Sequence, residues 1–340
     1  MKTKNLQYYV SSFLTTYLGG ERGLSENTSL SYSKAFQLLI PFLCDKTGKP
    51  INKITMENFN SQNIKCFLNS LEAVGNSAST RNQRLAAIKS FCRFVLQDDP
   101  QYMYSLQQIL NLKAKKHESS ELVYLSSVQL GWLLQKPDYT NRYGFKDLVM
   151  LTVLSDTGVR VSEFVNIRVS DVRLEPPAQV LVHGKGGKTR WVPLSSRTTD
   201  LLRIFMEKED LFNVVHQRQY LFLNRSGNQF TRAGVTYILQ KYAKLVHEEH
   251  PLNFLEKISP HCLRHTKAMM LLEMNQNLIY IRDILGHEHM KTTEIYARTD
   301  GTQIRKAVET ASANVPTVDP TRIDYKGNKE LLEWLVNYCK

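Results

Sequence analysis

The stretch "LGHEHMKTTEIYART", residues 285–299, decides how the rest of the chain is understood. It contains two histidines, a run of threonines and a tyrosine, Tyr296, that follows His287 by nine positions. A tyrosine hydroxyl can act as a nucleophile, whereas arginine, lysine and histidine stabilise charge or move protons. The chain has 16 tyrosines. What distinguishes Tyr296 is therefore its position after three upstream segments that contain arginine, lysine or histidine.

Length and composition indicate a two-domain globular protein. The 340 residues suffice for two domains with cores of their own. A hydrophobic share of 42% and a charged share of 22% are typical of a soluble protein, and no uncharged apolar run could cross a bilayer. The N-terminal segment is too polar for a signal peptide, so we expect a cytoplasmic protein without a membrane partner. The five cysteines form no CxxC pair, which argues against disulfides and against zinc.

The chain is strongly basic. Its formal net charge is +12, and both predicted domains carry more lysine and arginine than aspartate and glutamate. This distribution favours a polyanionic partner, most simply nucleic acid. Solubility alone remains an alternative explanation for the charge.

A charged segment without large apolar residues divides the chain. "KAKKHESSE", residues 113–121, is typical of an interdomain linker. Upstream, three capped segments repeat apolar residues at helical spacing, which predicts an all-helical domain over residues 1–112. Downstream, residues 122–340 form a second predicted domain, with a tail over 301–340.

The third helical segment, residues 79–97, has two distinct faces. Asn82, Ala86, Lys89 and Arg93 share one face, where the small Ala86 would permit close approach to a phosphate backbone. Asn82, Lys89 and Arg93 are therefore candidate DNA-binding residues, although a solvated flank would show the same pattern. The buried face is predicted to consist of Leu85, Ile88, Cys92 and Val95.

The second predicted domain is mainly α-helical with a small β-sheet or hairpin. A capping box at Ser126 and a Gly158 that follows an apolar segment mark two helices. The Val-rich runs on either side of the glycines in "AQVLVHGKGGKTRWVPL", residues 178–194, predict a β-hairpin. Further helices are predicted from about 195, over 231–246 and over 259–274, where Ser259 can cap and Pro260 fits the first turn.

The glycine-rich sequence "HGKGGKTR", residues 183–190, does not satisfy the spacing of a phosphate-binding P-loop. That motif requires a glycine five residues before Gly187, where this chain has Val182, and a helix after Thr189. We expect a hairpin tip instead. Its lysines, Lys185 and Lys188, would be placed to contact a DNA phosphodiester.

Two further segments carry arginine beside other reactive groups. In "SPHCLRHTKAMMLLEM", residues 259–274, His261 and Arg264 lie three apart and can act on one group. Metal binding by His261, Cys262 and His265 is disfavoured, since Cys262 points elsewhere. The buried side of this helix is predicted to carry Leu263, Met270 and Met274.

In "DTGVRVSEFVNI", residues 156–167, Arg160 follows a helix C-cap and Glu163 lies three residues later. A local ion pair of small energetic value is the simplest interpretation. Alternatively, Glu163 holds the guanidinium at the edge of a site, where it can bind a phosphate.

Together, "TGVRVSE", "GKGGKTR", "HCLRH" and "LGHEHMKTTEIY" resemble the successive catalytic motifs of the tyrosine recombinases, the phage integrase family. "STRNQRLAAIKSFCRFV" is similar to that family's core-binding domain, and the resemblance thus implies a DNA-binding domain over residues 1–112 and a catalytic domain over residues 122–340. The residue two positions after the tyrosine is Arg298, where many members carry histidine. The resemblance implies that Glu163 supports the first arginine and that the catalytic residues are Arg160, Lys185, His261, Arg264, His287 and Tyr296.

The resemblance implies site-specific recombination of double-stranded DNA through a 3′-phosphotyrosyl intermediate, in an integrase or transposase of a mobile element. Arg160 and Arg264 would stabilise the phosphate oxygens, so no cofactor or metal is expected. His261 would assist proton removal from Tyr296, Lys185 would protonate the leaving 5′-oxygen and His287 would bond a phosphate oxygen. The tail, 301–340, would link subunits of a homotetramer. A type IB topoisomerase and a non-catalytic DNA-binding protein are the alternatives.

Overall fold

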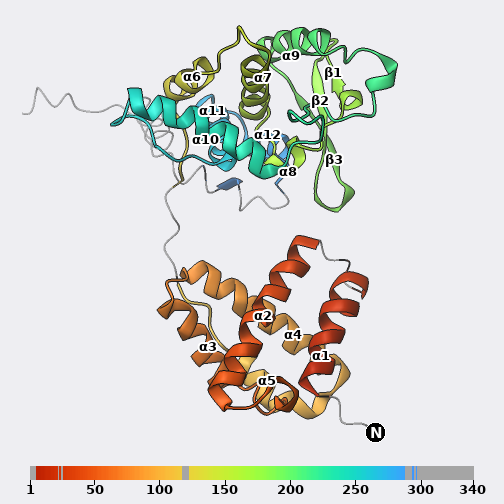
Figure 1. Cartoon of the computed structure of the whole chain (residues 1–340), viewed down its shortest axis with the longest axis vertical. Helices are drawn as coiled ribbons and strands as arrows, with labels where there is room; N and C mark the ends of the chain where they lie inside the picture. The colour runs from red at the N-terminus through yellow and green to blue at the C-terminus, as the bar shows by residue number, and fades with distance from the viewer. Residues whose placement is uncertain are drawn as a thin grey trace, which may run out of the picture. The chain divides into compact units, whose positions relative to one another are not determined.

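The computed structural model describes residues 5–21, 23, 26–116, 122–287, 293–294 and 296, apart from the side chains of residues 21, 26 and 185. Contacts divide the chain into two compact units, Met1–Ser120 and Glu121–Lys340 (Figure 1). The division falls within 113–121, where the sequence predicts a linker. None of the helices described here is long and apolar enough to cross a membrane.

The described part of the first unit is helical, as predicted. Asn60 and Ser77 cap their helices by accepting a backbone N–H with the side chain, which explains where α3 and α4 begin. Short 3₁₀ turns lie at Ile51–Lys53 and Pro100–Tyr102. The longer elements are α1 (Leu6–Ser12), a π-helix (Phe13–Glu21), α2 (Glu26–Thr47), α3 (Ser61–Ala73), α4 (Ala78–Asp98) and α5 (Met103–Leu110).

Aromatic packing around Phe91 of α4 holds this unit together. The Phe91 ring makes edge contacts with Phe13, Phe36 and Phe59 at centroid distances of 5.4, 5.0 and 5.2 Å. Phe13 belongs to the π-helix, Phe36 to α2 and Phe59 to the segment just before α3. Their contacts with Phe91 therefore hold these three segments against α4. The predicted buried face of α4 is confirmed, since its four residues are buried: Leu85, Ile88, Cys92 and Val95.

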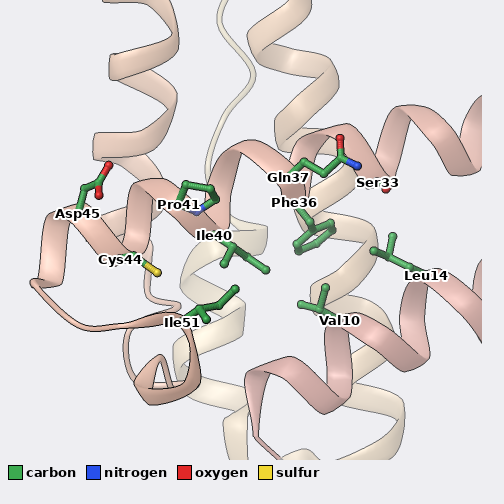
Figure 2. A pocket seen from close by; sticks show the side chains of 10 residues that line it. All are labelled: Val10, Leu14, Ser33, Phe36, Gln37, Ile40, Pro41, Cys44, Asp45 and Ile51. Carbon is green, nitrogen blue, oxygen red and sulfur yellow. The ribbon is translucent and has the colours of Figure 1, made fainter.

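An apolar pocket lies between α1, the π-helix and α2 (Figure 2). Val10, Leu14 and Ile40 line it, and Asp45 is its one ionisable carboxylate. None of the residues predicted to carry chemistry faces this pocket. The catalytic residues predicted from the sequence all belong to the second unit.

The second unit combines helices with one small sheet, which confirms the predicted fold class. The 3₁₀ turns are Val169–Asp171, Lys185–Gly187 and Val214–His216. The strands are β1 (Val172–Arg173), β2 (Gln179–His183) and β3 (Thr189–Pro193). The helices are α6 (Ser127–Gln135), α7 (Arg142–Thr157), α8 (Val161–Phe164), α9 (Ser196–Lys208), α10 (Arg232–Glu249), α11 (Pro260–Glu273) and α12 (Leu278–Leu285).

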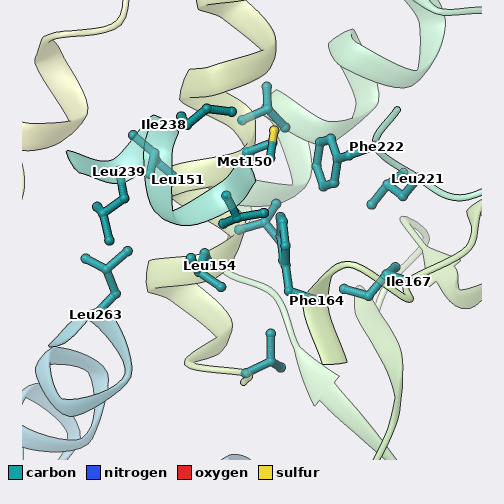
Figure 3. Packing of buried hydrophobic residues seen from close by; sticks show 14 of the residues in the cluster. Met150, Leu151, Leu154, Phe164, Ile167, Leu221, Phe222, Ile238, Leu239 and Leu263 are labelled. Carbon is teal, nitrogen blue, oxygen red and sulfur yellow. The ribbon is translucent and has the colours of Figure 1, made fainter. Parts of the chain in front are cut away.

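Helix α7 lies at the centre of the second core and packs against α9 and α11. Its Met150, Leu151 and Leu154 meet side chains from α8, α10 and α11 (Figure 3). Gly158 ends α7 in the left-handed conformation with φ of 60°, as the sequence predicts. A Cβ at Gly158 would lie 2.9 Å from Leu285 Cδ2. The end of α7 thus abuts the end of α12, which brings two of the predicted motifs together.

The predicted hairpin is present. Strands β2 and β3 pair antiparallel, with Leu181 opposite Trp191, and β1 adds a third strand on the far side of β2. Thr189 begins a strand and not a helix, which agrees with the rejection of a P-loop. Gly186 and Gly187 at the tip both have positive φ, a conformation that glycine adopts without strain.

Two details predicted for α11 are wrong. Met274 is 69% exposed, because α11 ends at Glu273 and Met274 is already its C-cap. Ser259 occupies the N-cap position, but its side chain makes no capping hydrogen bond. Pro260 does occupy the first turn, as predicted.

Candidate active site

Arg264 joins the ends of two helices. Its guanidinium donates to the carbonyl of Gly158, 2.9 Å away after α7, and to the carbonyl of Leu285, 2.7 Å away at the end of α12. Helix C-terminal carbonyls carry partial negative charge and lack partners within the helix, so they offset the burial of a cation. The side chain is only 4% exposed, and burial, followed by the charge of Arg160, lowers its pKa to about 10. It therefore stays charged at neutral pH.

Arg160 brings a second guanidinium to the same place. It is the N-cap of α8, and its Nη1 donates to Glu163 Oε1 at 2.9 Å. Both Nη atoms also contact the carbonyl of Gly286, at 3.3 and 3.2 Å. The Arg160 side chain keeps 35% of its surface exposed, so its guanidinium can contact a ligand.

Glu163 is a buried anion shared by two arginines. In addition to Arg160, its Oε2 accepts from Arg190 Nη2 at 2.8 Å. Burial by itself would raise the pKa of Glu163, but hydrogen bonds from Arg190 and Arg160 outweigh it and hold the pKa below its ordinary value. The carboxylate is 5% exposed, so the ion pair is more than the weak surface contact of the simplest interpretation.

His287 lies on the turn that follows α12. Its Nδ1 is 2.9 Å from the hydroxyl of Thr293, and its side chain is buried. Burial and the charges of Arg264, Arg160 and Arg190 lower its pKa to about 4, so the ring is neutral at pH 7. Because Thr293 takes Nδ1, Nε2 is the nitrogen that can serve a ligand.

The hydroxyl of Tyr296 lies among these groups and is bonded to His265. Tyr296 Oη is 2.9 Å from His265 Nδ1, and its ring stacks at 6.2 Å from that of His287. The tyrosine is 2% exposed, and burial raises its pKa although Arg264 and Arg160 act in the opposite direction. His261, predicted to assist this hydroxyl, is exposed, and its ring is 6.4 Å from that of His265.

The lysines of the hairpin are only partly described. Lys185 begins the 3₁₀ turn Lys185–Gly187, and its side chain lies outside the described part of the structure. Lys188 is exposed beside the tip. The roles of both lysines stay predictions.

These segments, far apart in the chain, match one known family. The phage integrase family matches residues 123–302, and the N-terminal SAM-like domain of phage integrases matches residues 12–98. The chain belongs to the tyrosine recombinases of the phage integrase family.

Relatives of this tyrosine recombinase match it over most of their length. The tyrosine recombinase XerD of Staphylococcus epidermidis is 32% identical over 289 residues, which cover 84% of this chain and 92% of that protein. A putative integrase/recombinase, y4rC of Sinorhizobium fredii, is 30% identical over 296 residues, with coverage of 87% and 88%. The Tn1549 transposon integrase in complex with transposon right end DNA has the same fold, with a TM-score of 0.69 at 18% identity and coverage of 90% and 98%.

Two contacts of the recombinase were not predicted from its sequence. His265 was considered only as a metal ligand, and Arg190 was not singled out. Arg190 extends from β3, where it donates from Nε to the carbonyl of Ile284 at 3.0 Å and from Nη2 to Glu163. The one sequence signal for Arg190 is its place at the end of "GKGGKTR". Arg190 thereby ties the hairpin to the end of α12.

The candidate DNA-binding residues of the first unit differ in their surroundings. The Asn82 amide donates to the carbonyl of Lys115 at 2.8 Å and accepts from its N–H at 2.9 Å, so it anchors the start of the linker segment. Lys89 is half-buried and Arg93 is exposed. DNA binding by these residues stays a prediction.

The metal alternative gains no support from the described residues, which contain no cluster of three histidine, cysteine or acidic side chains. Cys262 is 2% exposed and packs into the core, away from the exposed His261. Burial raises the pKa of its thiol to about 11, which disfavours the thiolate that a metal requires.

We expect stability to depend on pH through Glu163. A carboxylate with a lowered pKa stabilises the fold at neutral pH, and this stabilisation is lost as the pH falls through its pKa in the folded state. Glu163→Gln should cost roughly 3 to 5 kcal/mol at pH 7, because it leaves Arg160 and Arg190 without their anion. Urea unfolding of both proteins at pH 7 and below pH 4 measures this. A difference that does not shrink at low pH would contradict the assignment.

Gly286→Ala should lower the free energy of unfolding by more than the strain of the Gly286 backbone conformation accounts for. Gly286 has φ of 68°, and a Cβ there would lie 2.6 Å from Arg190 Cζ. Gly227, with φ of 76° and no atom within 4 Å of such a Cβ, is the matched control. Gly227→Ala should cost about 1 to 2 kcal/mol of backbone strain, and Gly286→Ala should cost more and impair DNA cleavage. Equal losses in urea unfolding would show that the Arg190 contact is unimportant.

Proposed function

We propose that this chain is a site-specific DNA recombinase that cleaves and rejoins duplex DNA through a 3′-phosphotyrosyl intermediate. The observation that carries the proposal is the convergence of a tyrosine hydroxyl with two guanidiniums, Arg160 and Arg264, and the imidazole of His287. Relatives named for tyrosine recombination, and the DNA-bound XerH recombinase with a TM-score of 0.65, support it. The basic charge of +12 suits a DNA partner.

The two arginines account for stabilisation of the transition state. A phosphodiester attacked by a phenol develops negative charge on its non-bridging oxygens. Guanidiniums present fixed, paired donors to such oxygens, and each donor of this kind is worth roughly 3 to 4 kcal/mol. Arg264 is immobilised by helix ends and Arg160 by Glu163, so both are positioned before DNA arrives.

Two proton transfers accompany the bond changes. Tyr296 must pass its proton to a neighbouring imidazole as Oη bonds the phosphorus, and the 5′-oxygen must gain a proton as its bond to phosphorus breaks. Lys185 at the hairpin tip is the proposed donor to the 5′-oxygen, and His287 the proposed donor to a phosphate oxygen. The phosphotyrosyl link conserves the energy of the phosphodiester. A 5′-hydroxyl from another strand can therefore reverse the reaction without ATP.

The biological role we propose is that of an integrase or transposase of a mobile element. The fold shared with the Tn1549 transposon integrase and the relative named integrase/recombinase support this role. A type IB topoisomerase would use similar chemistry but relax DNA without exchanging strands. A non-catalytic DNA-binding protein would not account for a tyrosine held among three cationic or imidazole groups.

Nicked suicide duplexes made from the DNA that flanks the gene test the proposal. Incubated with the full chain in EDTA and without ATP, they should yield adducts that resist SDS and carry a free 5′-hydroxyl. Addition of a second, 5′-hydroxyl-ended duplex should yield recombinant strands. Protein that relaxes a supercoiled plasmid carrying the same site but never joins a second duplex would favour the topoisomerase. Specific binding without any adduct would contradict the proposed chemistry.

We further propose that the protein works as a homotetramer on DNA and that its C-terminal tail, residues 301–340, docks on a neighbouring subunit. The tail lies outside the described residues. The proposal rests on the sequence of "NKELLEWLVNYCK", where apolar residues recur at helical spacing. Truncation after Gly301 should prevent assembly of the tetramer on DNA, as measured by sedimentation. Equal assembly of truncated and full-length protein would rule out this role for the tail.

A further inference from the structure

We propose that His265 is a catalytic residue that holds the phenol of Tyr296 and accepts its proton during DNA cleavage. The inference rests on the proposed function, which makes Tyr296 the nucleophile. The contact that motivates it is the 2.9 Å distance between Tyr296 Oη and His265 Nδ1. A general base must lie within hydrogen-bond reach of the proton that it removes, and His265 meets this condition before any DNA is bound.

The element that carries His265 is rigid. His265 follows Arg264 directly on α11, and Cys262, Thr266 and Ala268 on the same helix are buried. Thr266 also accepts the backbone N–H of Leu125 at 2.9 Å, which ties α11 to the segment before α6. The base and the phosphate-binding arginine are thus adjacent residues of one fixed helix, which suits a preorganised site.

The charge state of His265 fits a proton acceptor. Its ring is half-buried, and burial, followed by His261 and Arg264, lowers its pKa below the ordinary value. The imidazole is therefore neutral at pH 7, with a lone pair on one ring nitrogen. Tyr296, whose pKa is raised by burial, needs such a partner, because only about a thousandth of free tyrosine is ionised at pH 7.

The other two imidazoles of the site are less suited to this step. The ring of His287 stacks on Tyr296, and its Nδ1 is bonded to Thr293. His261 is exposed, and its ring centroid lies 6.4 Å from that of His265. Among the described residues, His265 is the side chain whose hydrogen bond to the phenol is observed. His261 remains available to contact the DNA phosphate beside Arg264.

Each proton that moves during cleavage and rejoining has a donor and an acceptor among these residues and the DNA. As Tyr296 Oη bonds the phosphorus, its proton passes to His265 Nδ1, while the bond from phosphorus to the 5′-oxygen breaks and that oxygen takes a proton from the proposed acid, Lys185. During rejoining, a 5′-hydroxyl attacks the phosphotyrosyl link and gives its proton to the now neutral Lys185, while His265 returns its proton to the departing phenol. The same residue should therefore affect cleavage and rejoining.

Variants of His265 distinguish a hydrogen bond to the Tyr296 phenol from acceptance of its proton. Single-turnover cleavage of the suicide duplex should fall about 100- to 10,000-fold in His265→Ala. His265→Gln offers an amide oxygen that can hold the phenol but cannot take its proton, so it should be about as slow. Replacement of Tyr296 by fluorotyrosine, whose phenol is more acidic, should restore much of the rate in His265→Ala and change the wild-type rate little. DNA affinity of the full chain, measured by gel shift, should be unchanged throughout.

Each contrary result has a distinct meaning. Wild-type protein that forms no adduct would refute the proposed function itself. Wild-type protein that forms adducts, with His265→Ala within about twofold of its rate, would refute the role of His265. Rates restored by His265→Gln, or a His265→Ala defect that fluorotyrosine does not relieve, would reduce His265 to a positioning residue and overturn proton transfer.

Discussion

Arg264→Ala should slow cleavage of the suicide duplex by about 100- to 1,000-fold, the loss expected when one preorganised donor to a developing oxyanion is removed. The same change removes two charge-assisted hydrogen bonds, to the carbonyls of Gly158 and Leu285, and leaves both helix ends without this partner. We expect the free energy of unfolding to fall by roughly 2 to 4 kcal/mol. Single-turnover rates and urea unfolding of the same preparation separate the two effects.

Two further variants sharpen the test of Arg264. Arg264→Lys keeps the charge but cannot present paired donors to two carbonyls and a phosphate, so it should recover little of the rate. Arg282→Ala removes an arginine of α12 that pairs with the exposed Asp283, and it should leave rate and stability nearly unchanged. Arg264→Ala protein that is folded and cleaves within tenfold of wild type would remove Arg264 from the active site.

Tyr296→Phe should abolish adduct formation, since it removes the one atom that is proposed to bond the phosphorus. Its effect on stability should be small, about 0.5 to 1.5 kcal/mol, because the ring stays buried and only the bond to His265 is lost. Tyr280→Phe is the matched control, because that hydroxyl belongs to a 63% exposed side chain on α12. Adducts that persist in Tyr296→Phe, or vanish equally in Tyr280→Phe, would contradict the nucleophile assignment.

Local signals predicted much of the fold. The Ser126 capping box, the left-handed Gly158 and the β2–β3 hairpin each depend on neighbours within a few residues, and the structure confirms them. The buried face of α4 could also be predicted, because helical periodicity alone sets which residues point inward. The predicted capping hydrogen bond of Ser259 and the predicted burial of Met274 are wrong. Both residues lie at an end of α11, where the exact limits of the helix decide which groups are capped or buried.

Contacts between distant segments could not be predicted from single motifs. Arg190 joins β3 to Glu163 and to Ile284, which are 27 and 94 positions away. His265 meets Tyr296 across 31 positions, and nothing in its helical periodicity distinguishes it from His261 as the partner of the phenol. The motifs place both histidines near the site, but only the packing of α11 against the segment with Tyr296 decides which ring touches the hydroxyl.

The proposed chemistry requires that Tyr296 become covalently bonded to DNA. The most direct measurement is protease digestion of the purified adduct, removal of all but the linked nucleotide by nuclease, and peptide sequencing by mass spectrometry. We predict a single modified peptide, with a 3′-phosphonucleotide on the Tyr296 oxygen. A nucleotide attached to any other side chain, or through its 5′-phosphate, would contradict the account.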